Sequence, residues 1–374
     1  MPLPSELEDK LRELSLVPPT TMPVLSVYLD ARPDQHGRDN FGPFLRKEFK
    51  ARGGTWPTRS AERASFDKDA ERIMEWLGTD LRPSSNGAAI FACSDIGLFE
   101  ALQFDAPFQA NELFVYHQPH LYTLARLLDQ YRPYAAVIAD TNSARIFVFG
   151  LGRTVQADTI ANPKVRSRSI IEGWWLRRFQ LKVENDHLRH AKQVIAQLER
   201  IVREEKIDHI LFAGDEVILS LMREQLSPTL ASKVVEEMKL DIAAPEHEIL
   251  RATLRVIQEE DARTDAERVH AMIDDYRAGG LAAVGIHDVL AALSNGQADT
   301  VFLSANFEQM HPGEEKLPRA LVPELTGMPA GTSVRVTDAI VTRAYQTGAE
   351  VRFIEDPELL ANVGGIGASL RYRL

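Results

Sequence analysis

Short apolar runs and one long amphipathic pattern alternate between residues 133 and 213, and few folds accommodate that order. The runs YAAVIA (134–139) and ARIFVF (144–149) are separated by a link short enough for a β-hairpin. Apolar residues then recur at helical spacing over 188–202, and the apolar run HILFA (209–213) follows. Strand, strand, helix and strand in this order predict a sheet that is covered by helices.

Similar alternation on both sides of this region predicts two further layered segments. We expect strands at 24–30, 87–92, 98–104 and 112–115, and a helix at 60–77. A charged helical pattern over 245–276 leads to helices at 286–293 and 333–347 and to strands at 300–304 and 351–354. The predicted fold class is therefore α/β and α+β in three domains. Residues 1–132 are the N domain, 133–265 the middle domain with a basic loop over 164–192, and 266–374 the C-terminal domain.

The composition excludes several classes of protein. With 44% hydrophobic and 26% charged residues, the 374-residue chain can bury sizeable cores, so a largely disordered chain is excluded. The single cysteine, Cys93, excludes an intramolecular disulfide framework and a multi-cysteine zinc site; we expect it to be a small buried hydrophobe. No apolar run reaches the ~20 residues that cross a bilayer, and the N-terminus is acidic and polar. We expect a cytoplasmic protein with no membrane partner.

Positive charge is concentrated in one segment of an acidic chain. The formal net charge is −11, yet residues 164–192 hold eight basic and three acidic residues, a local charge of +5. A local basic projection can bind one polyanionic surface. The alternative is a solvated basic loop that leads into a helix.

The common catalytic signatures are absent. The sequence holds no phosphate-binding loop of the G-x-x-x-x-G-K-[ST] type, no G-x-S-x-G elbow and no H-E-x-x-H. The glycines at 364–367 miss the dinucleotide-binding spacing, which favours a turn before the last strand. Asp140, which ends a predicted strand, is interpreted as a cap or turn residue. We therefore predict no catalytic residue and no cofactor.

Two histidines raise the question of a metal site. His187 and His190 lie about one turn apart with Asp186 on the predicted helix, which is a feasible ligand spacing. The arginines and lysine around them disfavour a bound cation. We expect both histidines to extend the basic face, and we predict no metal site.

The segment Gly173–Gln180 (GWWLRRFQ) places two tryptophans beside two arginines. Exposed aromatic and arginine side chains are the groups that contact RNA, through base stacking and phosphate pairing. The alternative is that both tryptophans pack under the loop as core residues. The candidate RNA-binding residues are Lys164, Arg166, Arg168, Gly173, Trp174, Trp175, Arg177, Arg178, Gln180, Lys182 and Arg189.

Segments found in order along most of the chain resemble the archaeal and eukaryotic class-one release factor and Pelota superfamily. The resemblance is to its bacterial branch, which includes the Balon-like ribosome hibernation factors. It is carried by SVYLD (26–30), NGAAIF (86–91), AVIADTNSARIFVFG (136–150), RFQ…HLRHAKQV (178–194), HILFAG (209–214), GIHDVLAALSNGQADTVFLS (285–304) and GGIGASLRY (364–372). It implies a ribonuclease H-like middle domain and an L7Ae-like C-terminal domain.

The departures from the family pattern bear on function. In family release factors a Gly-Gly-Gln tip positions water for ester hydrolysis, and here the tip maps to Glu172, Gly173 and Trp174. The stop-codon motif Asn-Ile-Lys-Ser is also absent. The resemblance thus implies a non-catalytic factor that binds the ribosomal A site and its rRNA in hibernation or rescue, with a translational GTPase such as elongation factor Tu as a possible partner.

Two alternatives remain open at this point. One is a peptidyl-tRNA hydrolase with a remodelled catalytic loop, in which Gln180 takes over the role of the missing glutamine. The other is a protein-binding adaptor that does not contact the ribosome.

Overall fold

The computed structural model describes residues 4–33, 35–36, 39–151, 153–161, 174–310 and 335–373. The chain forms two compact units. Unit 1 combines an N-terminal segment, Met1–Gln130, with a C-terminal segment, Ala262–Leu374, and unit 2 is Tyr131–Asp261. Among the described residues, no helix is long and apolar enough to cross a membrane.

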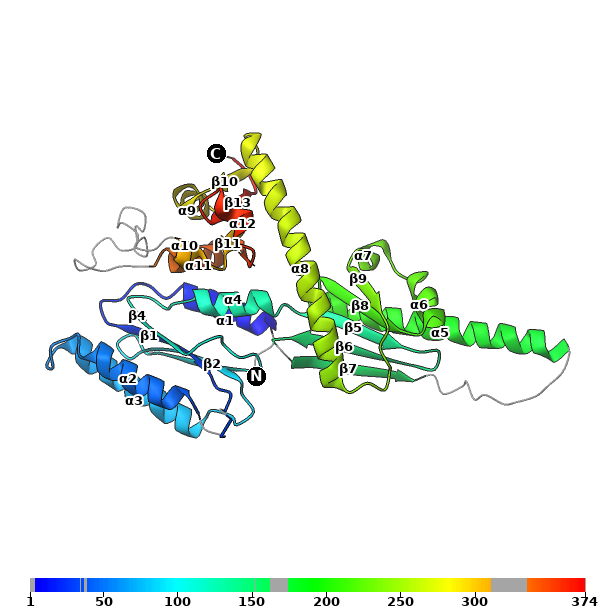
Figure 1. Ribbon diagram of the computed structural model, residues 1–374, viewed down its shortest axis with the longest axis horizontal. Coiled ribbons are helices and arrows are strands. Elements are labelled where there is room, and N and C mark those ends of the chain that lie inside the picture. Colours follow the sequence, from blue (N-terminus) through cyan, green and yellow to red (C-terminus); the bar gives the residue numbers. More distant parts are fainter. Residues whose placement is uncertain are drawn as a thin grey trace. The chain divides into compact units, whose positions relative to one another are not determined.

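The N-terminal segment of unit 1 is built on a four-stranded antiparallel sheet of order β3-β2-β1-β4. Helices α2 and α3 cover one face of this sheet, and α1 and α4 lie on the other side (Figure 1). Strand β2 can lie at the centre because all of its residues are buried. The elements are α1 (Pro4–Ser15), β1 (Val24–Asp30), α2 (Phe41–Gly53), α3 (Ala61–Thr79), β2 (Gly87–Cys93), β3 (Leu98–Phe104), β4 (Glu112–Tyr116) and α4 (Tyr122–Gln130).

The C-terminal segment of unit 1 holds a second four-stranded sheet, of order β10-β13-β11-β12. Strands β11 and β12 are parallel, and the other pairs are antiparallel. Gly364 and Gly365, with φ of 75° and 76°, form the predicted turn before the last strand. The elements are β10 (Ala282–Val284), α9 (Ile286–Ser294), β11 (Ala298–Ser304), α10 (Phe307–Met310), α11 (Val336–Thr347), β12 (Glu350–Ile354), α12 (Glu358–Ala361) and β13 (Ile366–Leu370).

Unit 2 is a single five-stranded sheet of order β7-β6-β5-β8-β9. The predicted hairpin forms its centre with β8, which pairs parallel to β5. Its elements are β5 (Tyr134–Ala139), β6 (Ser143–Gly150), β7 (Arg153–Ala161), α5 (Trp174–Glu204), β8 (His209–Gly214), α6 (Glu216–Arg223), α7 (Pro228–Ala231) and β9 (Val234–Met238). Helix α8 (Glu246–Arg277) begins in unit 2 and ends in unit 1.

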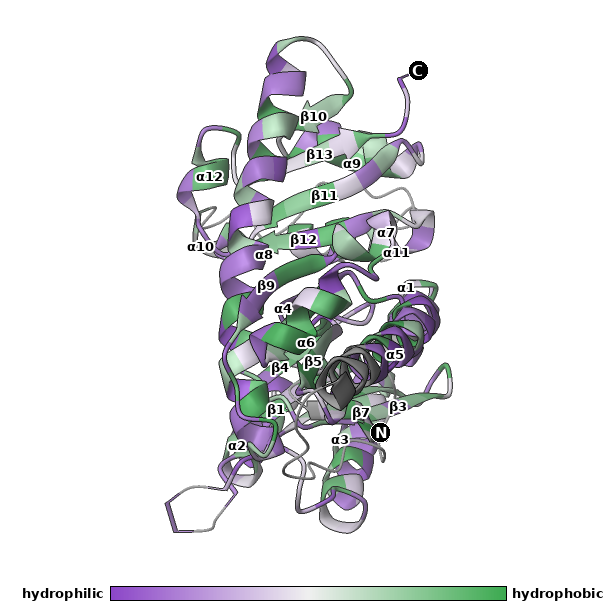
Figure 2. Ribbon diagram, turned by 90° about the vertical axis from the view of Figure 1, so that its right-hand side faces the viewer, coloured by the Kyte–Doolittle hydropathy of each residue, from purple (hydrophilic) through white to green (hydrophobic). Residues whose placement is uncertain are grey.

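The sheet of unit 2 is apolar on both faces, so each face requires a cover. One face packs against α5 and α6 through residues such as Val194, Leu198 and Ile218. The other packs against the first half of α8 through Ile249 and Ile257. Figure 2 shows the contrast between the largely hydrophobic strands and the many hydrophilic residues of α8.

The predicted mixed α/β and α+β class is confirmed, and one sheet lies in each of the three expected segments. The first and third segments nevertheless form one compact unit, with boundaries at 130/131 and 261/262. The division into three domains, with ribonuclease H-like and L7Ae-like members, stays a proposal. Helix α4 and strand β7 are elements that the sequence patterns do not predict.

Candidate functional site

Helix α5 carries the part of the predicted RNA-binding segment that the structure describes. The sequence predicts a basic loop over 164–192, and this is wrong from Trp174 onward, where the backbone is helical as far as Glu204. The physical reason is composition, because this stretch is rich in Leu, Arg, Lys and Gln and has neither glycine nor proline. The tryptophan pair therefore begins a helix.

The second half of α5 is docked on the sheet. Ala191, Val194, Leu198 and Ile201 are fully buried against unit 2. At about 1.5 Å per residue, the 31-residue helix is about 46 Å long. Its N-terminal part runs past the edge of the sheet (Figure 1). Basic residues at this end consequently lie on a projecting helix.

The predicted RNA-binding residues divide into three groups. Lys164, Arg166, Arg168 and Gly173 lie outside the described residues. For Trp174, Trp175, Arg177, Arg178, Gln180 and Lys182 the structure describes the helical backbone and not the side chains. Arg189 is exposed, and its guanidinium forms an ion pair with Asp186 one turn earlier on α5. The RNA-binding assignment of this set stays a prediction.

His190 does not extend the basic face, contrary to the sequence-based expectation. Its side chain is 1% exposed, and neither ring nitrogen has a hydrogen-bond partner. Burial lowers the pKa of His190, although the nearby backbone of Ser143 and the Asp140 carboxylate act in the opposite direction. The helix turns this residue toward the sheet, because it shares a face with Val194.

Asp140 closes the β5–β6 hairpin, in agreement with its interpretation as a turn residue. Its Oδ1 accepts hydrogen bonds from the backbone N–H groups of Asn142 and Ser143, both at 2.7 Å. This is an Asx turn, which satisfies the two amides that the hairpin leaves unpaired. Across the described residues, no group of three or more His, Cys, Asp or Glu side chains is arranged to hold a metal ion.

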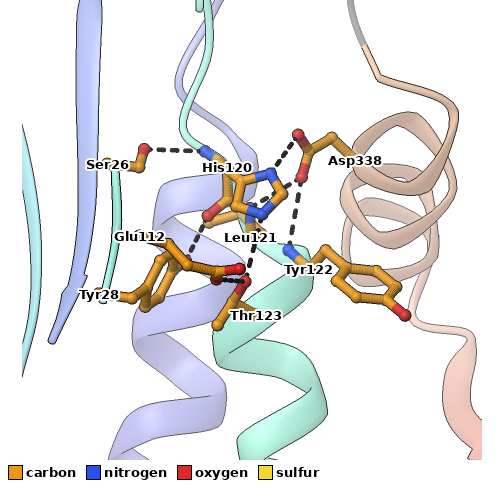
Figure 3. Close-up of polar contacts among 8 residues, drawn as sticks. All are labelled: Ser26, Tyr28, Glu112, His120, Leu121, Tyr122, Thr123 and Asp338. Atoms are coloured by element: carbon orange, nitrogen blue, oxygen red, sulfur yellow. Dashed lines mark hydrogen bonds and ion pairs between the residues drawn. The ribbon is translucent and has the colours of Figure 1, made fainter. Parts of the chain in front are cut away.

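The most extensive buried polar site lies within unit 1, where the N- and C-terminal segments meet (Figure 3). His120, just before α4, is 1% exposed, and its Nδ1 is 2.6 Å from Oδ2 of Asp338 on α11. The other Asp338 oxygen accepts from the backbone N–H groups of Leu121, at 3.0 Å, and Tyr122, at 3.4 Å. One carboxylate thus holds the imidazole and the start of α4 together.

The remaining polar atoms of His120 are also engaged. Its backbone N–H donates to Ser26 Oγ at 3.0 Å, and its carbonyl accepts from the Tyr28 hydroxyl. Its ring stacks on Phe114 at 3.6 Å between centroids. Burial raises the pKa of the Tyr28 phenol, and the Asp338 charge acts in the same direction. The phenol therefore stays protonated and remains a donor.

The second ring nitrogen of His120 leads to a cavity. Nε2 is 3.3 Å from Thr123 Oγ1, and Thr123 donates to Glu112 Oε2 at 3.2 Å. Thr123 thus links the imidazole of His120 to the carboxylate of Glu112. A cavity of about 160 Å³ is lined in part by Glu112, Phe114, His120, Thr123 and Arg126. Both nitrogens of His120 are therefore engaged, and the histidine fixes the geometry of this part of the site.

The sequence gives no local signal for this site. His120 and Asp338 are 218 residues apart and belong to no recognisable motif. A lone histidine after a proline and a lone aspartate in a helical pattern are both common in surface positions. Only the fold brings them together.

Comparisons with known proteins find a family match for the middle of the chain. Residues 119–258 match the sequence model of the bacterial archaeo-eukaryotic release factor family 10, a range that includes His120, α4 and most of unit 2. This part of the chain is therefore similar to the bacterial branch of the release factor superfamily. No curated protein sequence matches the chain.

Solved structures of Pelota proteins and of a translation termination-like factor are similar to the chain over much of its length. A ribosome-bound archaeal Pelota, described together with ABCE1, is 16% identical, with coverage of 98% of this chain and 94% of that one and a TM-score of 0.43. Dom34 of S. cerevisiae is 12% identical, covering 77% and 80%, with a TM-score of 0.42. Pelota of Archaeoglobus fulgidus is 15% identical, covering 77% and 79%, with a TM-score of 0.35.

Proposed function

We propose that this chain is a ribosome-binding translation factor of the release factor/Pelota type that does not hydrolyse peptidyl-tRNA. The observation that carries the proposal is the basic segment on the projecting end of α5, in a chain whose residues 119–258 match a release factor family. Lys and Arg neutralise RNA phosphates, and tryptophans stack on unpaired bases. The projecting helix would bring both kinds of group to rRNA.

The finer assignment follows the resemblance. We propose that the factor binds the A site in ribosome hibernation or rescue, with a translational GTPase such as elongation factor Tu as partner. Peptide release is not expected, because Glu172, Gly173 and Trp174 stand where a releasing factor has Gly-Gly-Gln. A carboxylate and an indole cannot reproduce the close backbone approach that the two glycines and the glutamine provide.

Ribosome co-sedimentation at several salt concentrations tests the contact. The variant Arg177→Gln/Arg178→Gln removes two charges from the projecting end of α5. The matched control Arg200→Gln/Arg203→Gln removes two exposed charges from the docked end of the same helix. We expect the first variant to bind more weakly and to lower the slope of log affinity against log salt by about 1 for each phosphate that it no longer neutralises, with the control unchanged.

Equal effects of both variants, or a wild-type affinity that does not change with salt, would contradict a phosphate-contacting helix end. Absence of the chain from ribosomal fractions at low salt would support the adaptor alternative. A peptidyl-tRNA release assay addresses the enzyme alternative. Release that is abolished in Gln180→Ala would replace the proposed function by hydrolysis.

The tryptophan pair gives a second test. If Trp174 and Trp175 stack on bases, replacing both by alanine removes on the order of 1–3 kcal/mol of binding each. Because about 1.4 kcal/mol is a factor of ten, ribosome affinity should fall at least tenfold with little change in melting temperature. A clear fall in melting temperature would instead identify them as packed residues.

A further inference from the structure

Helix α4 is too short to be stable by its own hydrogen bonds. It has nine residues, and isolated helices of fewer than ~12 residues are marginal in water. Its apolar side chains Leu124, Ala125 and Leu127 are buried. Its polar contacts come largely from the C-terminal segment, more than 170 residues later in the chain.

The N-terminal end of α4 is capped from the C-terminal segment. The first N–H groups of a helix have no partner within the helix, and a nearby residue in sequence usually accepts from them. Here the acceptor is Asp338, 217 residues away from Leu121. A carboxylate at this end also interacts favourably with the helix dipole. Removal of Asp338 would leave these amides without their acceptor.

A single face of α4 contacts the C-terminal segment along its length. Tyr122, Arg126 and Gln130 share this face because they are four residues apart, and Asp129 lies next to it, three residues after Arg126. Tyr122 donates to the Ala305 carbonyl at 3.0 Å, and Arg126 contacts both Glu355 oxygens at 3.0 Å.

The far end of the helix is held in the same way. Gln130 donates to Glu355 at 2.9 Å, and Asp129 accepts the backbone N–H of Phe353 on β12 at 2.8 Å. The contacts of this face therefore reach from the first residue of α4 to its last.

Strand β12 also contacts the chain near both points at which it passes from one unit to the other. Arg352 is buried, its Nη1 is 3.9 Å from Asp129 on α4, and its Nη2 is 2.6 Å from Asp265 on α8. Asp129 and Asp265 lie within a few residues of the two points at which the chain passes from one unit to the other. Arg352 thus forms ion pairs that link both of these chain segments, in α4 and α8, to β12.

We propose that α4 couples the C-terminal segment to the first residues of unit 2. Changes in the contacts of the C-terminal segment would alter the stability of α4 and of the start of β5. Only residues 131–133 separate α4 from β5. A partner that binds the C-terminal sheet would weaken the contacts of β12 and α11 with α4. Helix α4 would then become less stable, and the start of β5 would follow. The inference goes beyond ribosome binding and stands whether or not the chain binds ribosomes.

Hydrogen exchange of the full chain, followed by mass spectrometry, tests this inference. Glu355→Ala removes an exposed partner of Arg126 and Gln130, and Asp338→Ala removes the cap. Glu358→Ala, an exposed acid on α12, is the matched control. We expect exchange in α4 and in residues 131–139 to rise at least threefold in both variants, more in Asp338→Ala, with β1 and β2 unchanged and the control at the wild-type rate.

Two results would overturn the proposal. One is wild-type exchange in α4 when the C-terminal partners are removed. The other is an equal rise in β1 and β2, which would show general loosening of unit 1 without a specific grip on α4. If Asp338→Ala does not fold, Glu355→Ala decides, since its side chain is 56% exposed and its removal opens no cavity.

Discussion

Two buried histidines, His120 in unit 1 and His190 in unit 2, differ in how their polar atoms are paired. Both are 1% exposed. Every polar atom of His120 has a partner, from Asp338, Thr123, Ser26 and Tyr28. Neither ring nitrogen of His190 has one. A buried polar group without a partner costs free energy, so the two residues have opposite effects on stability.

The difference follows from how each unit is assembled. Unit 1 joins two segments that are far apart in the sequence, and directional polar contacts fix how they meet. Unit 2 is continuous, and apolar packing on both faces of one sheet suffices to hold it. His190 lies within such packing, on the face of α5 that the sheet covers.

The largest expected effect is that of Asp338→Ala. It removes the partner of a buried imidazole and the acceptor of two amides at the start of α4, and each buried polar group left without its partner costs about 1–3 kcal/mol. Denaturant unfolding of a Trp174→Phe/Trp175→Phe background measures this, because Trp56 and Trp76 in unit 1 then report alone. Asp299→Ala, at an exposed ion pair, is the control. A loss below about 1 kcal/mol would contradict the assigned role of the site.

Arg352→Met should cost somewhat less, about 3 kcal/mol, because the methionine side chain preserves part of the packing. It leaves Asp265 buried beside Asp129 without the charge that separates them. The double variant Arg352→Met/Asp265→Asn removes one of these charges and should recover part of the loss. Thermal unfolding of the two variants measures the recovery. A double variant that is less stable than Arg352→Met alone would show that Arg352 and Asp265 are not electrostatically coupled.

His190→Leu should change the pH profile of unit 2. Because burial holds the pKa of His190 below its usual value of 6.5, the unfolded chain binds the proton more tightly. The contribution of His190 to the stability of unit 2 is then complete above pH 6.5, and it is lost as the pH falls toward the pKa of the folded state. The leucine variant should be flatter between pH 7.5 and 5 in melting temperature, and His247→Gln, at an exposed histidine of α8, is the control. Parallel profiles of wild type and His190→Leu would refute this account.

Asp69→Asn should have the smallest effect, and it extends the comparison to a partly satisfied group in unit 1. Asp69 Oδ2 accepts the Ser94 N–H at 3.0 Å, while Oδ1 is buried and has no partner. Burial raises the pKa of Asp69. Its contribution is thus complete below the unfolded pKa of 3.8 and is lost as the pH rises through the folded pKa. The variant should gain about 1 kcal/mol or less at pH 7 and nothing at pH 3.5, as measured by denaturant unfolding.

Local patterns predict the elements whose signal is local. Strands β1 and β3 lie where alternation and apolar runs place them, and α3 begins where Ser60 caps it by accepting the Arg63 N–H at 3.1 Å. Strand β7 (RTVQADTIA) is an edge strand with few apolar residues, so no periodic signal marks it. Helix α4 escapes prediction because the polar face that resembles a solvated surface is the face that contacts β12.

The candidate sites were predictable to different degrees. The positive charge near residue 174 is visible in the sequence, but helical structure from Trp174 replaces the predicted loop because nothing in that stretch interrupts a helix. Burial of His190 depends on which face of α5 meets the sheet. The pairing of His120 with Asp338 depends on two segments that only tertiary structure brings together. Pairs of this kind can be identified only from the three-dimensional structure.

The cap on α4 also has a consequence for biosynthesis. The N–H groups of Leu121 and Tyr122 leave the ribosome well before Asp338, which is 217 residues downstream of Leu121. At roughly 5–20 residues per second, the start of α4 waits about 10–40 s for its acceptor. During that interval unit 2 can complete its sheet, because all of its strands come from one continuous stretch of chain. The order of synthesis thus allows unit 2 to fold before the two segments of unit 1 can pack together. Until then, the surface of the N-terminal segment that contacts the C-terminal segment is accessible to chaperones and proteases.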